Sequence, residues 1–157
     1  MSESKKVLIV DDDPDFVEGI KAILDTEYDT EVTYNPKDGW DALKRGGHDL
    51  LCLDIMMGRG AEGVMMARKI RKDPVLREMP VLIITSLREQ IAFLFPGQAV
   101  HPGFVPVDEL VEKPVDPDLL LQKAAAMIAL AVEGLSLDGQ RDRLIKGLPG
   151  VGQNGCL

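Results

Sequence analysis

Four short apolar runs, each followed at once by polar residues, constrain the fold of this chain more than any other feature. Residues 7–10, 50–53 and 81–84 contain only aliphatic residues and one cysteine, which is typical of parallel strands buried on both faces. A fourth and weaker run lies at 110–112. Open α/β sheets bind ligands beyond the carboxyl ends of their strands, so the polar residues after the runs define a candidate site. These residues are Asp11, Asp12 and Asp13 after the first run, Asp54 after the second, Thr85 and Ser86 after the third, and Lys113 after the fourth.

Helical patterns occupy the segments between the runs. The pairs Asp13-Pro14 and Asn35-Pro36 each provide a helix cap followed by a proline at the first helical position. They predict helices that run to about residue 25 and to residue 45, with a short β-branched strand at 31–34 between them. The regular alternation of strand and helix predicts an α/β fold: a doubly wound, five-stranded parallel sheet with helices on both faces. A third helix is predicted from the helical spacing of Val64, Met65, Ala67 and Ile70.

The later part of the chain is less regular. Residues 86–95 predict a fourth helix, and 96–106 form a long, proline-containing connection that we expect to run over the surface. The final helix, at 118–132, is apolar nearly all round, although a helix covering one side of a sheet needs only one apolar stripe. Either the connection and the tail fold over it, or this face binds a second copy or a partner. We expect one domain at 1–133 and a C-terminal tail at 134–157 with room for one short helix.

The net charge and the absence of targeting signals limit the partners that we expect. The net charge of −8 predicts no nucleic-acid partner, because affinity for phosphate backbones comes mainly from Lys and Arg. Part of the acidic excess is local, since five acidic residues lie between Asp11 and Glu18, as a cation site requires. The polar start and the lack of an apolar stretch of ~18–20 residues predict a chain with no signal peptide and no membrane partner.

The cysteines and histidines do not predict a site of their own. Cys52 lies inside a predicted buried strand and Cys156 near the end of the chain, so they form no disulfide framework, which fits a reducing cytoplasm. We therefore expect a cytoplasmic protein. His48 and His101 are expected on the surface, rather than as phosphate carriers or ligands.

The acidic residues at the strand ends predict a phosphoryl site. If the first and third strands are neighbours, their ends lie about 5 Å apart, which brings Asp11 and Asp12 next to Asp54. Carboxylates this close raise one another's pKa, and a hard cation such as Mg²⁺ removes that conflict. With the metal bound, the Asp54 carboxylate becomes a nucleophile that can take a phosphoryl group. The Lys113 ammonium and the Thr85 hydroxyl can then donate to the oxygens of that group.

Four motifs at these strand ends resemble those of response-regulator receiver domains of two-component signalling. They are Val10-Asp11-Asp12-Asp13, Asp54-Ile55-Met56-Met57, Ile84-Thr85-Ser86 and Glu112-Lys113-Pro114, and the resemblance covers roughly residues 5–133. It implies a flavodoxin-like sheet of order 2-1-3-4-5 and makes the expected domain at 1–133 a receiver domain. It also implies a sensor histidine kinase or phosphotransfer protein as donor and a downstream protein partner. The face of the fourth helix, fifth strand and fifth helix is a candidate homodimer surface.

The resemblance also implies a role for each site residue. Asp54 is then the phosphoacceptor, Thr85 moves toward the phosphoryl group, and Lys113 pairs with it. Mg²⁺ is implied as the cofactor, and its protein ligands are Asp12 directly, Asp11 through a water molecule, Asp54, and the main-chain carbonyl of Met56.

The sequence departs from the family pattern in the parts that carry the output signal. Leu110 stands three residues before the lysine, where the family usually has an aromatic switch residue, so rotation of a Tyr or Phe is not the readout. The loop after Asp54 has Gly58 where a proline is usual and reaches its glycine, Gly63, one residue late. The segment between the third and fourth motifs is several residues longer than usual. These departures concern the output mechanism more than the acceptor chemistry.

Three functions stay open from the sequence. The first is a stand-alone response regulator, not an enzyme, that takes a phosphoryl group from a histidine kinase on Asp54 and switches partner binding. No output domain is expected, because the chain after Val132 is too short for one. The second is a magnesium-dependent phosphatase of haloacid-dehalogenase type. Asp11-x-Asp13 resembles the nucleophile motif of these enzymes. The third is an interaction module on a receiver scaffold that works without phosphorylation, as Leu110 and the altered loops suggest.

Overall fold

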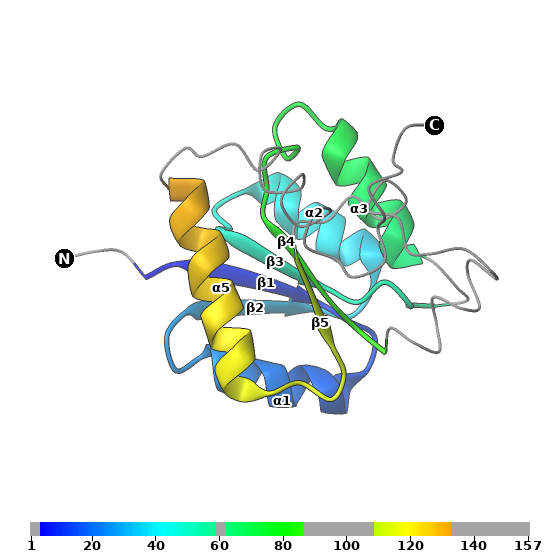
Figure 1. The fold of residues 1–157 in the computed structure, drawn as a ribbon. Helices are drawn as coiled ribbons and strands as arrows, with labels where there is room; N and C mark the ends of the chain where they lie inside the picture. The colour runs from blue at the N-terminus through cyan, green and yellow to red at the C-terminus, as the bar shows by residue number, and fades with distance from the viewer. Residues whose placement is uncertain (1–3, 59–61, 87–108, 133–157) are drawn as a thin grey trace, which may run out of the picture.

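The computed structural model describes residues 4–58, 62–86 and 109–132, which build one parallel sheet between two layers of helices (Figure 1). The strand order is β2-β1-β3-β4-β5 and every pairing is parallel, which confirms the predicted sheet and its order. The strands are β1 (Lys6–Val10), β2 (Asp29–Thr33), β3 (Leu50–Leu53), β4 (Val81–Thr85) and β5 (Glu109–Glu112). The helices are α1 (Pro14–Leu24), α2 (Pro36–Arg45), α3 (Glu62–Lys72) and α5 (Pro117–Val132).

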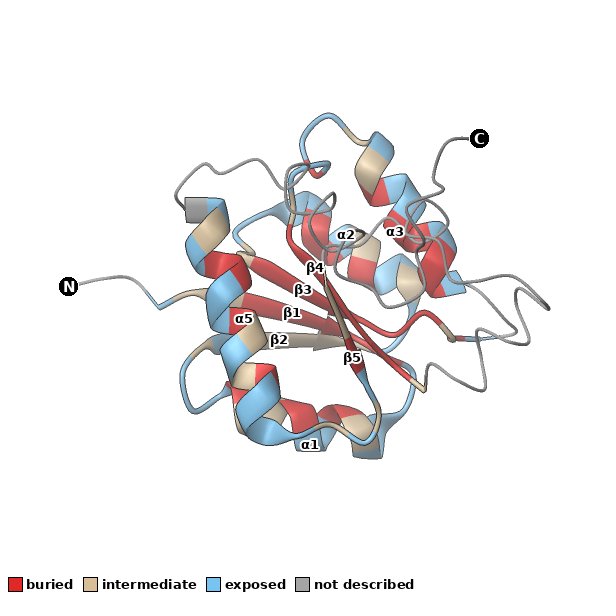
Figure 2. Cartoon of the chain, in the orientation of Figure 1, coloured by how far each residue is buried: buried red, intermediate tan, exposed pale blue. Residues whose placement is uncertain are grey.

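Strand β1 shows why both faces of the sheet carry helices. Successive residues of a strand point to opposite faces. Val7 and Ile9 pack with side chains of α1 and α5, whereas Leu8 and Val10 pack with side chains of α2 and α3. Figure 2 shows β1, β3 and β4 buried along their length, while the edge strand β2 is half-buried. An aliphatic run without polar alternation therefore forms a strand between two helical layers.

The two predicted helix starts are confirmed. The Asp13 side chain caps α1 by accepting hydrogen bonds from the backbone N–H groups of Asp15 and Phe16. The Asn35 side chain caps α2 by accepting from the N–H of Asp38 at 2.8 Å. Such caps satisfy N–H groups that have no partner inside the helix. They determine where the chain turns back after β1 and after β2, at the carboxyl edge of the sheet.

Two side chains lie elsewhere than their sequence pattern suggests. Met65, one of the four residues that predict α3, is 67% exposed, and its neighbour Met66 is buried one turn before Ile70. Adjacent residues differ by about 100° around a helix, so only one of the two methionines can face the core. The expectation of a surface position for His48 is wrong: its side chain is 1% exposed and forms a 2.7 Å hydrogen bond with Glu31. A ring nitrogen with a carboxylate partner can be buried.

Helix α5 is apolar on both sides for two different reasons. Its inner side packs against the sheet, whereas alanine, a strong helix former, makes up half of its exposed residues. The explanations that the sequence leaves open, cover by the tail and a dimer or partner surface, stay predictions. The buried residues are Leu120, Ala124, Met127 and Ile128, and the exposed ones include Ala125, Ala126, Ala129 and Ala131.

Some predictions fall outside the described residues. These are the fourth helix at 86–95, the connection at 96–106 and the short helix in the tail at 134–157. The boundary of the domain at 1–133 therefore stays a prediction. Among the helices that the structure describes, none combines the length and the apolar character needed to cross a membrane.

Candidate functional site

The carboxyl ends of β1 and β3 bring three aspartates together. Val10 and Leu53 are partners in neighbouring strands. Asp11 follows Val10 and Asp54 follows Leu53, so the two aspartates lie side by side at the strand ends. Carboxylate oxygens of Asp11, Asp12 and Asp54 all lie within 4.8 Å of one another. Asp11 and Asp54 are only 3% and 6% exposed, whereas Asp12 is exposed. The cluster is therefore buried on one side and open to solvent on the other.

Lys113 reaches this cluster from the end of the edge strand β5. It follows β5, and its backbone N–H donates to the Thr85 carbonyl at the end of β4. Its Nζ lies 3.1 Å from Asp11 Oδ2 and 3.3 Å from Asp54 Oδ2. The peptide bond between Lys113 and Pro114 is cis. The ammonium is thus the counter-charge that Asp11 and Asp54 share.

Backbone N–H groups orient each of the three carboxylates. Asp54 Oδ1 accepts from the N–H of Met56, and Asp12 Oδ2 accepts from the N–H of Gly58, both at 3.0 Å. Asp11 Oδ1 accepts from the N–H of Asp13, also at 3.0 Å. The Met56 amide was not among the sequence-predicted contacts, and the predicted role of the Met56 carbonyl as a metal ligand stays a prediction. These bonds hold the free oxygens toward one another.

The site has more negative charge than its single lysine can neutralise. The pKa of Asp11 is raised, first by burial of the carboxyl group and also by the nearby Asp54 carboxylate, against the opposing effects of the Asp13 N–H and Lys113. Hard divalent cations prefer oxygen ligands, and Mg²⁺ is usually held by one or two carboxylates together with waters. Three converging carboxylates with one open side therefore fit a magnesium site.

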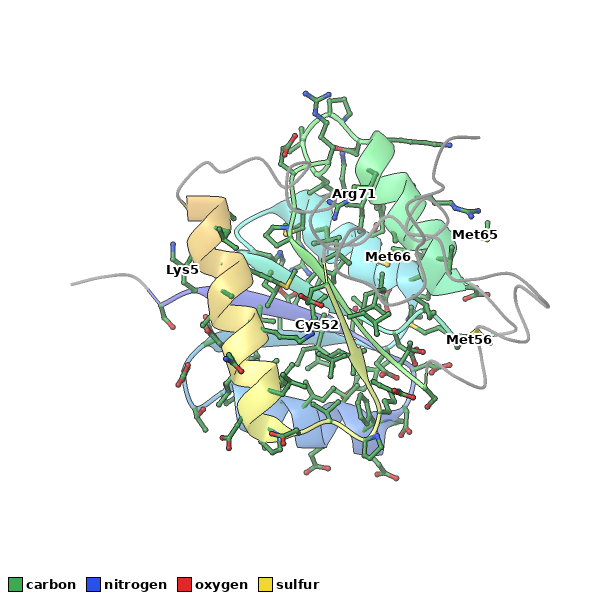
Figure 3. The ribbon with its side chains drawn as sticks, in the orientation of Figure 1. Lys5, Cys52, Met56, Met65, Met66 and Arg71 are labelled. Carbon is green, nitrogen blue, oxygen red and sulfur yellow. The ribbon has the colours of Figure 1, made fainter. Side chains whose placement is uncertain are left out.

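Thr85 and Cys52 are both buried in the sheet. Thr85 is the last residue of β4 and is fully buried, while its predicted role as a switch hydroxyl stays a prediction. Cys52 lies in the middle of β3 (Figure 3), and burial raises the pKa of its thiol to about 12. A thiol with so high a pKa has almost no thiolate at neutral pH, which supports the expectation that Cys52 has no chemical role.

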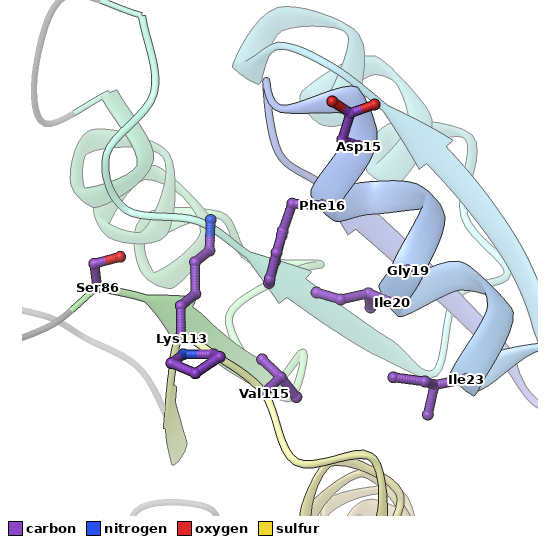
Figure 4. Close-up of a pocket in the computed structure, with 9 residues that line it drawn as sticks. Asp15, Phe16, Gly19, Ile20, Ile23, Ser86, Lys113 and Val115 are labelled. Carbon is purple, nitrogen blue, oxygen red and sulfur yellow. The ribbon is translucent and has the colours of Figure 1, made fainter.

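Phe16 is part of the site in a way that sequence reasoning missed. The Lys113 ammonium lies 3.8 Å from the centre of the Phe16 ring, within the range of a cation–π contact. Phe16 also lines an open groove of about 490 Å³ beside the site, together with Ile20 and Ile23 of α1 and Val115 (Figure 4). The available signal was its position in the first turn of the helix that follows the acidic residues.

The two glycines after Asp54 have identifiable structural roles. Gly58 has a φ of 62°, a left-handed conformation that glycine adopts without strain. Gly63 lies so close to the loop after β3 that an added Cβ would be 2.1 Å from the Asp54 carbonyl oxygen and 2.5 Å from Ile55 Cα. The glycine that comes one residue late relative to the family pattern therefore permits the contact between α3 and the backbone of Asp54. Leu110 of β5 is half-buried against the core on the α2–α3 side.

Comparison with known proteins shows the family. The family model of the response regulator receiver domain matches residues 7–125, and the chain belongs to that family. The chain is 28% identical over 122 residues to the response regulator Rre1 of Synechocystis sp., a match that covers 76% of this chain and 50% of Rre1. The chain thus spans about half the length of this curated relative.

Two solved structures share the fold. A CheY-like receiver domain protein of Methanospirillum hungatei superposes with a TM-score of 0.69 at 24% identity, covering 84% of this chain and 99% of that chain. The receiver domain of the sensor histidine kinase PA1611 of Pseudomonas aeruginosa superposes with a TM-score of 0.69 at 18% identity, covering 81% and 99%. That structure holds a magnesium ion in its active-site cleft. At these identities the likeness to this chain is one of fold.

Proposed function

We propose that this chain is a phosphorylation switch in which Asp54 accepts a phosphoryl group from a histidine kinase or a phosphotransfer protein. The observation that carries the proposal is the position of the Lys113 ammonium, 3.1 Å from the Asp11 carboxylate and 3.3 Å from the Asp54 carboxylate, with Asp12 close by. Acceptor, cation ligands and counter-charge thus share one edge of the sheet. Family membership supports the proposal, because phosphoryl acceptance is general among receiver domains.

The transfer is a displacement at phosphorus. An Asp54 carboxylate oxygen attacks the phosphorus of a phosphohistidine, the P–O bond forms as the P–N bond breaks, and the leaving imidazole takes a proton from solvent. Lys113 pairs with an oxygen of the transferred group, and the Thr85 hydroxyl donates to another. The Met56 N–H, 3.0 Å from Asp54 Oδ1, orients the acceptor carboxylate. Later attack of water on phosphorus releases inorganic phosphate and restores the carboxylate.

We assign Mg²⁺ to Asp11, Asp12 and Asp54, with the Met56 carbonyl as a further ligand. When bound, the ion neutralises charge on the transferring phosphoryl group. The exposed position of Asp12 supports the assignment, because it would leave room for the waters that Mg²⁺ usually keeps. The magnesium ion in the cleft of the PA1611 receiver domain supports it as well.

The output of the switch is binding of a downstream protein. With Leu110 in β5 in place of an aromatic residue, the readout does not use a rotating ring. The identity of the partner, the homodimer through the face of the fourth helix, β5 and α5, and the absence of nucleic-acid and membrane partners stay predictions. So do the stand-alone arrangement and the cytoplasmic location.

A haloacid-dehalogenase-type phosphatase has less support. Its nucleophile motif would use Asp11 and Asp13, but the Asp13 carboxylate accepts two backbone hydrogen bonds as the cap of α1. Such an enzyme would also leave Asp54 without a role. The receiver function is therefore the better account of the whole cluster.

Phosphorylation by acetyl phosphate in the presence of Mg²⁺, followed by intact mass, tests the proposal. The wild-type chain gains one phosphoryl group, and Asp54→Asn abolishes that gain. Asp41→Asn, which changes an exposed aspartate of α2, is the matched control and retains it. A phosphoryl group on Asp11 with steady turnover of phosphate esters would point to the phosphatase. Partner binding that is the same for Asp54→Asn and wild type would point to the phosphorylation-independent module.

A further inference from the structure

A second groove, of about 760 Å³, lies between α2 and α3. Trp40, Met65 and Met66 line it, and Met65 is 67% exposed. Of the described residues that line it, four are cationic and one, Glu62, is acidic. The whole chain has a net charge of −8, so this groove is a local concentration of positive charge on an acidic protein.

Three of the cations at this groove have no acidic partner among the described residues. Lys37, Lys69 and Lys72 make no ion pair with any residue in the described ranges, whereas most lysines elsewhere in those ranges do. The Lys69 ammonium lies over the Trp40 ring at 4.0 Å, a cation–π contact that leaves the positive charge available to an anion. The groove therefore carries three lysines, Lys37, Lys69 and Lys72, whose charge is not neutralised by an ion pair with the described part of the chain.

The groove combines these lysines with apolar surface. Trp40 is half-buried, and Met65 is 67% exposed. Tryptophan and methionine are enriched at protein interfaces, where a few such anchors provide most of the binding energy. A ligand that fits must bring both negative charge for the lysines and apolar side chains for Trp40 and Met65.

We propose that the α2–α3 groove binds an acidic segment of a partner protein, in which carboxylates alternate with large apolar side chains. The carboxylates pair with Lys37, Lys69 and Lys72, and the apolar side chains pack on Met65 and Trp40. A nucleotide fits less well, because Lys69 covers the ring on which a base would stack. Repulsion from the chain's acidic residues elsewhere is largely screened beyond about 8 Å at physiological salt, whereas opposite charges in contact within the groove are screened less.

Trp40 provides a direct readout, because it is the only tryptophan in the chain. The probe is a synthetic peptide of Glu, Asp, Leu and Phe, and its counterpart has Gln and Asn in place of the acids. The acidic peptide is expected to change the Trp40 emission at saturating concentration and to weaken steeply with salt. Lys69→Glu and Lys72→Glu each lower its affinity by about fivefold.

The matched control is Lys5→Glu, the same charge change at a position well separated from Met65 in Figure 3. It is expected to leave the affinity unchanged. Lys69 and Lys72 are exposed, so equal thermal midpoints of all three variants verify that they fold. Equal binding of the acidic and amide peptides, or no loss in the two groove variants, would overturn the proposal. So would Trp40 emission that responds to ATP but not to the peptide, or a self-association that Lys69→Glu removes.

Discussion

The two ends of the sheet balance charge in opposite ways. At the carboxyl end, the three carboxylates of Asp11, Asp12 and Asp54 share the single ammonium of Lys113. Toward the amino end, the one carboxylate of Glu31 meets three basic side chains. The first arrangement has negative charge left that a cation can neutralise. The second has no negative charge left for a cation.

The three basic partners of Glu31 form a structural tie. Glu31 lies 2.8 Å from Arg45, 2.7 Å from His48 and 3.4 Å from Lys6, and so links β2 to α2, to the start of β1 and to the residues before β3. Its pKa is lowered, first by the hydrogen bond with His48, whereas the pKa of Asp11 is raised, first by burial. A carboxylate with more basic partners than it needs stabilises the fold. A buried group of carboxylates with too few basic partners indicates a functional site.

The largest effect is expected where the carboxyl end is most tightly packed. Gly63→Ala places a Cβ 2.1 Å from the Asp54 carbonyl oxygen and 2.5 Å from Ile55 Cα, and backbone atoms cannot move aside cheaply. We expect a loss of about 3 kcal/mol in the free energy of unfolding, measured by urea denaturation. Gly19→Ala in α1 is the control, because no atom lies within 4 Å of the added Cβ, and it should stabilise by about 0.5–1 kcal/mol. Wild-type stability of Gly63→Ala would show that α3 moves freely from the loop after β3.

Removal of magnesium tests the difference between the two ends of the sheet most directly. At a concentration of about 100 times its dissociation constant, Mg²⁺ should stabilise the wild-type chain by about 2.7 kcal/mol, and EDTA should remove that gain. Asp12→Asn takes away a carboxylate of the cluster and should lose most of the gain. Glu31→Gln, at the other end, should keep it. A magnesium effect on stability that is equal in all three proteins would contradict the assignment of the metal to the carboxyl end.

A smaller effect is expected from the tie itself. Glu31→Gln should lower the free energy of unfolding at pH 7 by about 1 kcal/mol, because Arg45, His48 and Lys6 lose their common charged partner. Since the pKa of Glu31 is lowered in the fold, its contribution is present above its ordinary value of 4.5 and is lost as the pH falls through the lowered pKa. The difference between variant and wild type should therefore narrow in acid.

Glu78→Gln is the matched control for that experiment. Its carboxylate is 70% exposed and lies 3.8 Å from its Arg77 neighbour, so its removal should change stability little at any pH. A variant difference at Glu31 that stays constant between pH 7 and pH 3 would mean that the side chain acts by packing and not by charge.

The strands and the polar residues at their carboxyl ends were predictable because local patterns encode them. An aliphatic run such as 50–53 is compatible with few positions other than the middle of a covered sheet, and the polar residue after it then lies at the sheet edge. The caps at Asp13 and Asn35 were predictable for the same reason, since a cap depends on neighbours two or three residues away. Less was predictable at β2, which begins at Asp29 and not at residue 31, because polar edge strands have weak patterns.

Contacts between distant residues were not predictable in the same way. The burial of His48 depends on Glu31, 17 residues away, and the contact of Lys113 with Phe16 joins a loop after β5 to the first turn of α1. The amide of Gly58 reaches the carboxylate of Asp12, 46 residues away in the chain, only because the loop after β3 turns back over the site. None of these contacts has a signature in the residues adjacent to it.

The sequence by itself determined the strand-and-helix alternation, the order of the acidic, hydroxyl and lysine residues along it, and the family that those motifs indicate. Hydrophobic periodicity and helix caps act over a few residues, so they can be read locally. Only the tertiary structure decided which charges meet, which methionine of α3 is exposed, and where lysines with no acidic partner among the described residues gather around Trp40. Electrostatic and packing energies depend on distances through space, which chain position alone does not specify.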